Sequence, residues 1–419
     1  MSTKHSKAAA EFLKNKKQAA WHDETLWLVR AKRDRLSKEV PEWEELRNMA
    51  CATKLYSNSH LDELLVEFEN NARANGAHVY WAKDADEYCN IVYNILNQHG
   101  VKHFIKSKSM LAEECELNPF LESKGIEVVE SDLGERILQL MHLKPSHIVL
   151  PAIHIKREQV GELFEREMGT EKGNFDPTYL THAARKNLRQ KFIHAEAAMT
   201  GANFAVASTG EIVVCTNEGN ADMGTSQPKL QIAAFGMEKI VPDRESLGVF
   251  TRLLARSATG QPITTYTSHY RKPREGGELH IIIVDNGRSK ILADPKHIKT
   301  LNCIRCGACM NTCPVYRRSG GYSYTYFIPG PIGINLGMLK APLHYYDNVS
   351  ACSLCYSCSF VCPAKVDLAE QIYLWRQDLD KLGKADRMKK VMSGGMEFMM
   401  KRPSRSEERR VGKECTAEC

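Results

Sequence analysis

Two cysteine runs constrain this 419-residue chain more than any other feature of its sequence. Each run follows the pattern C-x2-C-x2-C-x3-C-P, which holds iron–sulfur clusters in bacterial ferredoxins. The runs are Cys303-Ile-Arg-Cys306-Gly-Ala-Cys309-Met-Asn-Thr-Cys313-Pro314 and Cys352-Ser-Leu-Cys355-Tyr-Ser-Cys358-Ser-Phe-Val-Cys362-Pro363. A four-thiolate zinc site is the alternative, but zinc sites use two cysteine pairs rather than a triplet followed by x3-C-P. The sequence therefore predicts two [4Fe–4S] clusters and, with them, one-electron chemistry.

The spacing also predicts which thiols share a cluster. Three thiolates on a tight loop can hold three corners of one cube, whereas the fourth leaves on a proline-bearing turn and reaches the other cluster. Small residues in the loops should let backbone N–H groups approach the sulfurs, which tunes the reduction potential; these are Gly307, Ala308, Ser353 and Ser357. We expect the first cluster on Cys303, Cys306, Cys309 and Cys362, and the second on Cys352, Cys355, Cys358 and Cys313.

Composition excludes several other classes of protein. The chain has 14 cysteines but no signal-peptide pattern at its N-terminus, which favours redox or metal chemistry in the cytoplasm over a disulfide scaffold. Apolar runs are strand-sized and shorter than the roughly 20 residues that span a bilayer. The net charge is +6 without a basic stripe, so we expect no nucleic-acid partner. The isolated Cys51, Cys89, Cys115 and Cys215 are expected to be small buried hydrophobes.

Shifts in pattern divide the chain into four segments. Residues 1–59 read as helices, and residues 60–295 alternate short apolar runs with helical stretches, which predicts a mostly parallel α/β domain. Residues 296–400, rich in Cys, Pro, Gly and Tyr, are predicted to form an α-rich, two-cluster ferredoxin-like domain. Residues 401–419 lack an apolar period and are interpreted as a non-native or disordered tail.

Within these segments the pattern predicts individual elements. The predicted strands are Ala77–Ala82, His103–Lys106, Ile126–Val129, His147–Leu150, Asn203–Ser208, Glu211–Thr216, Leu230–Phe235, Ile263–Thr267 and Glu278–Val284. The predicted helices are 8–36, Glu42–Leu55, a third from a cap at Ser59 to about Asn75, Ala85–His99, Met110–Lys124 (broken near Pro119), Leu133–Leu143, 156–168, 178–200 and Arg244–Ala258.

Polar residues that follow strands are candidate ligand contacts, because ligands of open α/β sheets bind outside the carboxyl ends of the strands. Asn217, Glu218, Gly219 and Asn220 follow one predicted strand, and a plain Asn- and Gly-bearing turn is the alternative there. Lys106 and Ser107 follow another strand and open a helix whose backbone N–H groups could hold a carboxylate. The alternative there is a capped helix start with solvated lysines.

Other motifs are less informative. The adjacent Glu238 and Lys239 are interpreted as a surface ion pair. His99 and His103 have H-x-x-x-H spacing, but Gly100 lies between them, so they should not share a helical face. Neither a G-x-x-x-x-G-K-[ST] loop nor a convincing G-x-G-x-x-G fingerprint is present, so nucleotide hydrolysis and a Rossmann dinucleotide site are unsupported.

The segment between the two cysteine runs is longer than a minimal ferredoxin needs. Its aromatic residues fit either a docking surface for a partner or packing beneath the clusters, and the sequence does not choose between them. These residues are Tyr322, Tyr324, Tyr326 and Phe327.

Several motifs in order make the chain resemble the lactate utilization protein B family from about residue 8 to residue 400. The motifs are Pro41-Glu-Trp-Glu-Glu-Leu-Arg47, Ser131-Asp-Leu-Gly-Glu135, Pro145-Ser-His-Ile-Val-Leu-Pro-Ala-Ile-His154, Thr216-Asn-Glu-Gly-Asn220, Cys303-Ile-Arg-Cys-Gly-Ala-Cys309, Tyr322 and Pro329-Gly-Pro-Ile-Gly333. The resemblance implies that residues 60–295 form a LUD domain with a sheet similar to those of sugar isomerases and CoA transferases. The family continues with a further C-terminal segment where this chain has residues 401–419.

The resemblance also implies a function and partners. Such a protein is an iron–sulfur subunit of a complex that oxidises L-lactate to pyruvate without NAD, rather than a complete enzyme. Its companions would be a cysteine-rich subunit similar to heterodisulfide reductase and a small LUD-domain subunit. The alternatives are a pure electron carrier whose LUD domain is a scaffold, or a subunit of another 2-hydroxy acid system such as glycolate oxidase. The sequence assigns no catalytic residue.

Overall fold

A computed structural model describes residues 4–384 and 387–401 of the chain. Contacts divide the chain into two compact units, Met1–Ile372 and Tyr373–Cys419. The predicted helical, α/β and cysteine-rich segments thus pack together up to Ile372, and the domain boundaries stay a prediction. The predicted tail lies almost wholly outside the described residues, as do Cys415 and Cys419.

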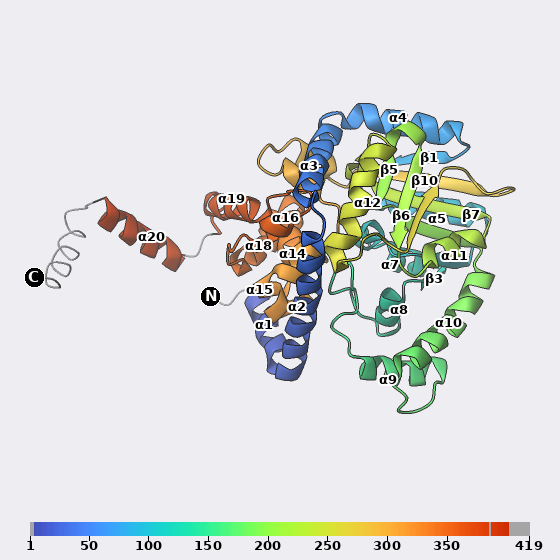
Figure 1. Cartoon of the computed structure of the whole chain (residues 1–419), viewed down its shortest axis with the longest axis horizontal. Coiled ribbons are helices and arrows are strands. Elements are labelled where there is room, and N and C mark those ends of the chain that lie inside the picture. Colours follow the sequence, from blue (N-terminus) through green and yellow to red (C-terminus); the bar gives the residue numbers. More distant parts are fainter. Residues whose placement is uncertain (1–3, 385–386, 402–419) are drawn as a thin grey trace, which may run out of the picture. The chain divides into compact units, whose positions relative to one another are not determined.

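A six-stranded sheet forms the centre of the first unit (Figure 1). All its strands are parallel, in the order β1-β10-β7-β4-β2-β3. Their bounds are β1 His78–Ala82, β2 His103–Lys106, β3 Glu127–Glu130, β4 Ala197–Gly201, β7 Leu230–Gly236 and β10 Glu278–Val284. Strand β10, the second in this order, is a continuous apolar run from Ile281 to Val284 because both of its faces are covered there.

Each face of this sheet has its own cover. Ile282 and Val284 of β10 pack with the helices α5, α6 and α7, whereas Ile281 and Ile283 pack with α4 and the second sheet. Helix α10 packs its Leu188 and Phe192 on β2, β3 and β4. The helices up to this point are α1 Lys4–Lys14, α2 Lys16–Lys38, α3 Trp43–Ser59, α4 Leu61–Ala74, α5 Ala85–Gln98, α6 Met110–Glu114, α7 Leu117–Ser123, α8 Leu133–Leu140, α9 Arg157–Met168 and α10 Pro177–His194.

A second, four-stranded sheet lies against the first, in the order β8-β5-β6-β9. Strand β6 is antiparallel to both β5 and β9. The bounds are β5 Phe204–Val206, β6 Glu211–Thr216, β8 Ile240–Val241 and β9 Tyr266–Tyr270, with helices α11 Asn220–Ser226 and α12 Arg244–Thr259 and 3-10 turns η1 Ala207–Thr209 and η2 Met237–Lys239.

Five sequence predictions of elements were wrong. The helix predicted over 8–36 is two helices, α1 and α2, separated at Asn15. The run 147–150 is a loop rather than a strand. The helix predicted over 178–200 ends at His194, and the missed residues form the central strand β4, whose short Ala-rich sequence looks helical in isolation. The break in Met110–Lys124 falls at Glu116, in the left-handed conformation, because Pro119 is tolerated in the first turn of α7. The strand predicted at Ile263–Thr267 is displaced to β9.

The cysteine-rich segment is built from short helices and 3-10 turns. Their bounds are α13 Arg288–Leu292, η3 Ile298–Asn302, α14 Ala308–Thr312, α15 Pro314–Ser319, η4 Gly321–Ser323, α16 Gly330–Lys340, α17 Pro342–Tyr345, η5 Tyr346–Ala351, α18 Ser357–Val361, α19 Leu368–Lys381 and α20 Arg387–Met400.

The N-terminal helices hold the last turn of the second cysteine run. Arg33 of α2 donates from Nη2 to the carbonyl oxygen of Val361 at 3.0 Å. Arg47 of α3 donates to the carbonyl oxygen of Cys362 from Nε at 3.1 Å and from Nη2 at 2.9 Å. Both arginines are buried. Two helices from the start of the chain thereby position a cysteine more than 300 residues later in the sequence.

The aromatic residues between the cysteine runs pack rather than form a surface. Tyr324 and Tyr326 are each 6% exposed, and Phe327 is half-buried. Tyr322 is exposed, but its hydroxyl donates to the carbonyl oxygen of Lys144 at 2.6 Å. These contacts favour packing beneath the cysteine runs over a docking surface.

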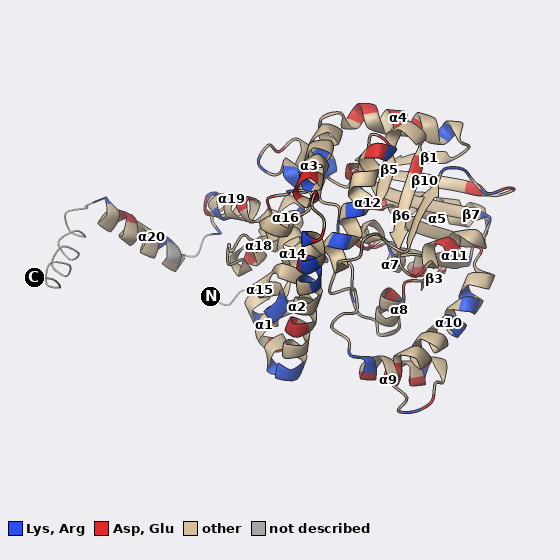
Figure 2. Cartoon of the chain, in the orientation of Figure 1, with Lys and Arg blue, Asp and Glu red and all other residues tan. Residues whose placement is uncertain are grey.

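Charges of both signs are interspersed along the ribbons of α2, α4 and α9 (Figure 2). Among the residues that the structure describes, the helices are all too short or too polar to cross a membrane.

Candidate functional site

Four thiols from both cysteine runs line one small cavity. Cys303, Cys306 and Cys309 come from the loop between η3 and α14, and Cys362 follows α18. The remaining walls are apolar: Ile148, Ile304, Gly307, Ala308, Ile332, Pro363, Ala364, Val366 and Leu368. Burial, and then the charge of Cys362, raise the pKa of Cys306 to about 12, as expected for buried thiols that lie close together.

The other four thiols form a second group. Burial raises the pKa of Cys313 to about 11, and the charges of Cys352 and Cys355 add to the rise. Cys358 likewise has a raised pKa, from burial and from the charges of Cys313, Cys352 and Cys355. The structure therefore brings the last cysteine of each run to the triplet of the other run, in the two groups of four that the spacing predicts.

The two triplet loops share an unusual backbone. Arg305 and Leu354 hold equivalent positions in the two runs, and both have positive φ, 61° and 54°. The following Gly307 and Tyr356 are also left-handed. Non-glycine residues in this conformation cost energy and concentrate at functional sites. The strained loop turns its N–H groups inward.

Backbone N–H groups point at the sulfurs, as the small residues in the loops suggest. Arg305 and Leu354 donate to Cys303 Sγ at 3.4 Å and Cys352 Sγ at 3.3 Å. Val366 and Tyr316 donate to Cys362 Sγ at 3.4 Å and Cys313 Sγ at 3.5 Å. Of the four small residues named from the sequence, Ala308 supplies such a donor, to Cys306. Two of the donors named above, Arg305 and Leu354, are left-handed residues that the sequence did not reveal, whereas Val366 and Tyr316 are not left-handed.

The separation of the sulfurs fits a polynuclear cluster better than a single zinc ion. Thiolates on one tetrahedral zinc lie about 3.8 Å apart, given Zn–S bonds of about 2.3 Å. Within the described ranges, only His78, Glu278 and His280 bring three potential ligand atoms within 4.8 Å of one another. Among the described residues no three thiols of either group are as close together as that, so their spacing is wider than that of thiolates around one zinc ion and leaves room for a larger cluster.

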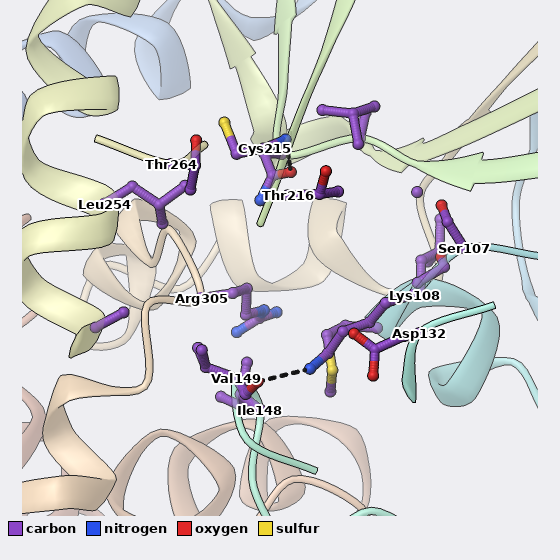
Figure 3. A pocket seen from close by; sticks show the side chains of 18 of the residues that line it. Ser107, Lys108, Asp132, Ile148, Val149, Cys215, Thr216, Leu254, Thr264 and Arg305 are labelled. Carbon is purple, nitrogen blue, oxygen red and sulfur yellow. Dashed lines mark hydrogen bonds between the residues drawn. The ribbon is translucent and has the colours of Figure 1, made fainter. Parts of the chain in front are cut away.

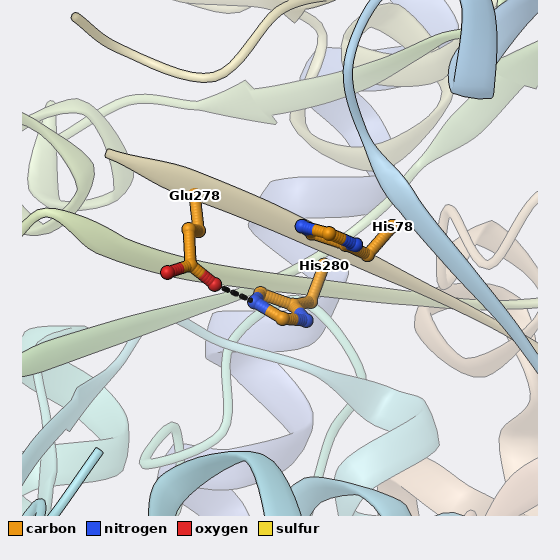
Figure 4. A group of neighbouring side chains, drawn as sticks. All are labelled: His78, Glu278 and His280. Carbon is orange, nitrogen blue, oxygen red and sulfur yellow. Dashed lines mark hydrogen bonds and ion pairs between the residues drawn. The ribbon is translucent and has the colours of Figure 1, made fainter. Parts of the chain in front are cut away.

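The His78 group lies at the amino ends of β1 and β10 (Figure 4). The rings of His78 and His280 are stacked at 4.8 Å, and His280 Nε2 is 2.9 Å from Glu278 Oε2. His99 also contacts Glu278, at 3.2 Å. His103 instead pairs with Glu127 at 2.8 Å, so the two histidines with H-x-x-x-H spacing do not come together.

A pocket of about 310 Å³ lies where β2, β4, β6 and β7 end (Figure 3). Four of the six residues predicted from the sequence line it, namely Ser107, Asn217, Glu218 and Asn220. Lys106 does not, because it is fully buried and paired with Glu130 at 2.8 Å. Gly219 does not line it either, and its φ of +66° begins helix α11. In the loop 217–220, Gly219 therefore makes the turn and the other three residues line the pocket.

Two of these polar residues are tied to neighbouring loops. Asn217 accepts from the backbone N–H of Thr265 at 3.1 Å and donates to Gln261 Oε1 at 3.0 Å. Asn220 donates to Ser131 Oγ at 3.3 Å. They shape the pocket rather than offer free groups to a ligand.

Glu218 differs from them because its carboxylate is held by one backbone donor, the N–H of Leu133 at 3.2 Å. Burial of the carboxyl group, and then the nearby charge of Asp132, raise its pKa to about 7. Asp132 also lines the pocket. Glu218 can therefore hold a proton near neutral pH.

The pocket also has cations that the sequence analysis missed, Lys239, Arg288 and Arg305. The interpretation of Glu238 and Lys239 as a surface ion pair was wrong. Glu238 is 3% exposed and accepts from Arg288 Nε, because η2 is covered by α3 and α13. Burial by itself would raise the pKa of Glu238, but Arg288 and Arg305 lower it to about 2. The sequence did hold one indication that Arg305 is near a functional site, because it lies between Cys303 and Cys306 of the first cysteine triplet.

The pocket and the first thiol cavity share a wall. Ile148 lines both of them. The neighbouring residues Ile304 and Arg305 line the thiol cavity and the pocket, respectively. The loop that was predicted as a strand thus separates a polar pocket from an apolar thiol cavity. A small molecule in the pocket would lie one side chain away from the first group of thiols.

Comparisons with known proteins agree with this architecture. A LUD domain family model matches residues 65–291, and a 4Fe-4S dicluster domain model matches residues 299–366. The Lactate utilization protein B of Geobacillus thermodenitrificans is 43% identical over 83% of this chain and 75% of its own length. The "Uncharacterized electron transport protein YkgF" of Escherichia coli K12 is 41% identical over 85% of this chain and 76% of its own length.

Among solved structures, a DUF162 family protein of Deinococcus radiodurans aligns with 54% of this chain and 98% of its own. The identity is 15% and the TM-score 0.31, which is too distant a likeness to carry an argument about the site.

Proposed function

The chain belongs to the lactate utilization protein B family, and we propose that it is the iron–sulfur electron-transfer subunit of a complex that oxidises L-lactate to pyruvate without NAD. In this proposal the chain is a subunit of a lactate dehydrogenase complex rather than a complete enzyme. Its two companions are the cysteine-rich, heterodisulfide-reductase-like subunit and the small LUD-domain subunit.

The interleaved thiol groups carry the proposal. Cys303, Cys306, Cys309 and Cys362 would hold one [4Fe–4S] cluster, and Cys352, Cys355, Cys358 and Cys313 the other. Each such cluster, when bound, exchanges one electron at a time. Because each run supplies a ligand to the other group, the two clusters would be held in a fixed relation within a single folded unit.

The chain's own residues suit this task. Apolar side chains exclude water from the first thiol cavity. The cations of Arg33, Lys54 and Arg305 lie close enough to the first thiols to interact with their charge, Arg33 with Cys306 and the other two with Cys303. They would offset the negative charge of a thiolate-bound cluster and raise its reduction potential.

Metal analysis and spectroscopy test the first part of the proposal. Protein purified without oxygen should contain about eight irons and eight sulfides per chain. Dithionite should produce an electron paramagnetic resonance signal from two reduced clusters, and the Cys51→Ala variant should match it, since Cys51 lies outside both groups. Zinc in place of iron would overturn the proposal.

The lactate part needs the whole complex. The chain is co-expressed with the two companion subunits, and L-lactate, D-lactate or glycolate is added without NAD. We expect L-lactate alone to reduce the clusters and to yield pyruvate. Reduction by glycolate instead would favour the other 2-hydroxy acid system, and no reduction by any of the three would favour a carrier with a scaffold domain.

A further inference from the structure

The pocket beside the first thiol group is lined by four cationic and four acidic side chains, but two of the cations are outside its ion pairs. Lys239 lines it, and within the described part of the chain its ammonium group has neither a hydrogen bond nor an ion pair. Lys108 Nζ donates to the carbonyl oxygen of Val149 at 3.2 Å and is paired with no described carboxylate (Figure 3). A pocket with two unpaired ammonium groups is suited to an anion.

Arg305 adds a third cation with spare donors. Its Nη2 is 3.6 Å from Glu238 Oε1, beyond normal hydrogen-bond distance. Its Nη1 is buried and has no acceptor among the described residues. A buried guanidinium donor without an acceptor is destabilising, so such groups usually have a partner in the working protein.

The carboxylates near these cations are already engaged. Arg288 Nη1 and Nη2 donate to the two oxygens of Glu114, each at 2.9 Å, and Arg288 Nε donates to Glu238. Glu238 is therefore shared between two arginines. Lys239 and Lys108 are left without a carboxylate partner within ion-pair distance among the described residues, and both line the pocket.

Two acidic side chains, Asp132 and Glu218, also line the pocket with Ser107, and Lys108 lies beside Asp132 (Figure 3). Burial, and then the charge of Asp132, raise the pKa of Glu218 to about 7, so Glu218 can hold a proton near neutral pH. These carboxyl groups suit a neutral hydroxyl or keto oxygen rather than a second anionic group. A phosphate dianion would be repelled by the two carboxyl groups, which a small monocarboxylate could avoid.

We propose that this pocket binds a 2-hydroxy or 2-oxo monocarboxylate, with its carboxylate on Lys239, Lys108 and Arg305 and its C2 oxygen toward Glu218 and Asp132. The proposal rests on the function proposed above and names the subunit and residues that hold the substrate. The pocket volume of about 310 Å³ is at the small end of ligand pockets. Among the described residues, Ile148 is then the only one that lines both the substrate pocket and the first thiol cavity.

Calorimetry of the anaerobic, cluster-loaded chain tests the proposal without relying on turnover. L-lactate and pyruvate are titrated beside propionate, which lacks the C2 oxygen, and inorganic phosphate. We expect both acids to bind more tightly than propionate and phosphate. Lys239→Met should weaken L-lactate binding by about 10- to 100-fold, because it removes a charge-assisted contact. Lys272→Met, an exposed lysine outside the pocket, is the matched control and should leave binding unchanged.

Glu218→Gln tests the acidic side chains of the pocket. It should reduce the preference for L-lactate over propionate while leaving propionate binding almost unchanged. Tighter binding of phosphate than of either acid, or equal binding of L-lactate by the Lys239→Met and Lys272→Met variants, would overturn the proposal. So would the absence of any binding.

Iron content separates this inference from the function on which it rests. About eight irons in every variant would show that the chain is folded and loaded. Loaded protein that binds no monocarboxylate, but whose cluster potential falls in Lys239→Met, would show that the cations serve the cluster alone. Protein that never holds clusters would instead overturn the proposed function.

Discussion

Replacing two cysteines at a time distinguishes crosswise coordination from coordination within each run. In the structure Cys362 lies with the first triplet although it belongs to the second run, and burial, with a smaller contribution from the charge of Cys303, raises its pKa. A double replacement of Cys362 and Cys303 by Ala then removes two ligands of one cluster. A double replacement of Cys362 and Cys352 removes one ligand from each.

The expected iron content follows directly. With about four irons per cluster, Cys303→Ala/Cys362→Ala should fall from about eight irons per chain to about four. Cys352→Ala/Cys362→Ala should lose most of both clusters, because each cube is left with three thiolates. The signal of the remaining reduced cluster in the first variant should lack the splitting caused by a nearby second spin.

The iron and sulfide contents of both double variants are measured after anaerobic gel filtration. Electron paramagnetic resonance spectra of the dithionite-reduced samples show which cluster signals remain. Cys51→Ala serves as the control for losing a thiol that belongs to neither group. If Cys352→Ala/Cys362→Ala kept about four irons and Cys303→Ala/Cys362→Ala kept none, each run would hold its own cluster, and the reasoning from the structure would be refuted.

Three further predictions concern the charges around the site. Arg288→Met should lower the free energy of unfolding by about 3–5 kcal/mol, because it leaves buried carboxylates without their cation; a shift in the urea midpoint no larger than that of Lys290→Met would contradict this. Glu238 has a folded pKa of about 2 against 4.5 for the free side chain, so its stabilisation is present above pH 4.5 and is lost as pH falls toward 2. The gap between the urea midpoints of the parent and Glu238→Gln should therefore narrow from pH 7 to pH 4, and a constant gap would count against it. Arg47→Met removes the donors to the carbonyl oxygen of Cys362 and should lower iron below about eight per chain, with the second cluster retained; full iron content would show that Cys362 needs no such support.

Strands with strong local patterns were predicted well. The bounds of His103–Lys106, Glu211–Thr216 and Glu278–Val284 agree with the structure because Ile-, Val- and Phe-rich runs between polar turns leave few other readings. Strand β4 was missed because Ala197 and Ala198 have high helix propensity, and only pairing with β2 and β7 makes them a strand.

The candidate site was predicted in part. Residues 217, 218 and 220 were found because a polar loop after a strand at the carboxyl edge of a sheet is a local signal. Lys106 was misplaced because its own strand carries it into the interior, where Glu130 of the neighbouring strand neutralises it. That partner is set by strand order, which the sequence does not state.

The cysteine spacing by itself determined the chemistry of this protein, because three thiols two residues apart are brought together by a single loop whatever surrounds it. Only the tertiary structure decided what lies next to that loop. Lys108, Lys239 and Arg305 are far apart in the sequence, and each alone looks like an ordinary solvated cation. In the folded chain the two sheets pack near the cysteine loop, so that these three side chains line one pocket. Such an arrangement depends on contacts between residues far apart in the sequence, which local sequence patterns do not reveal.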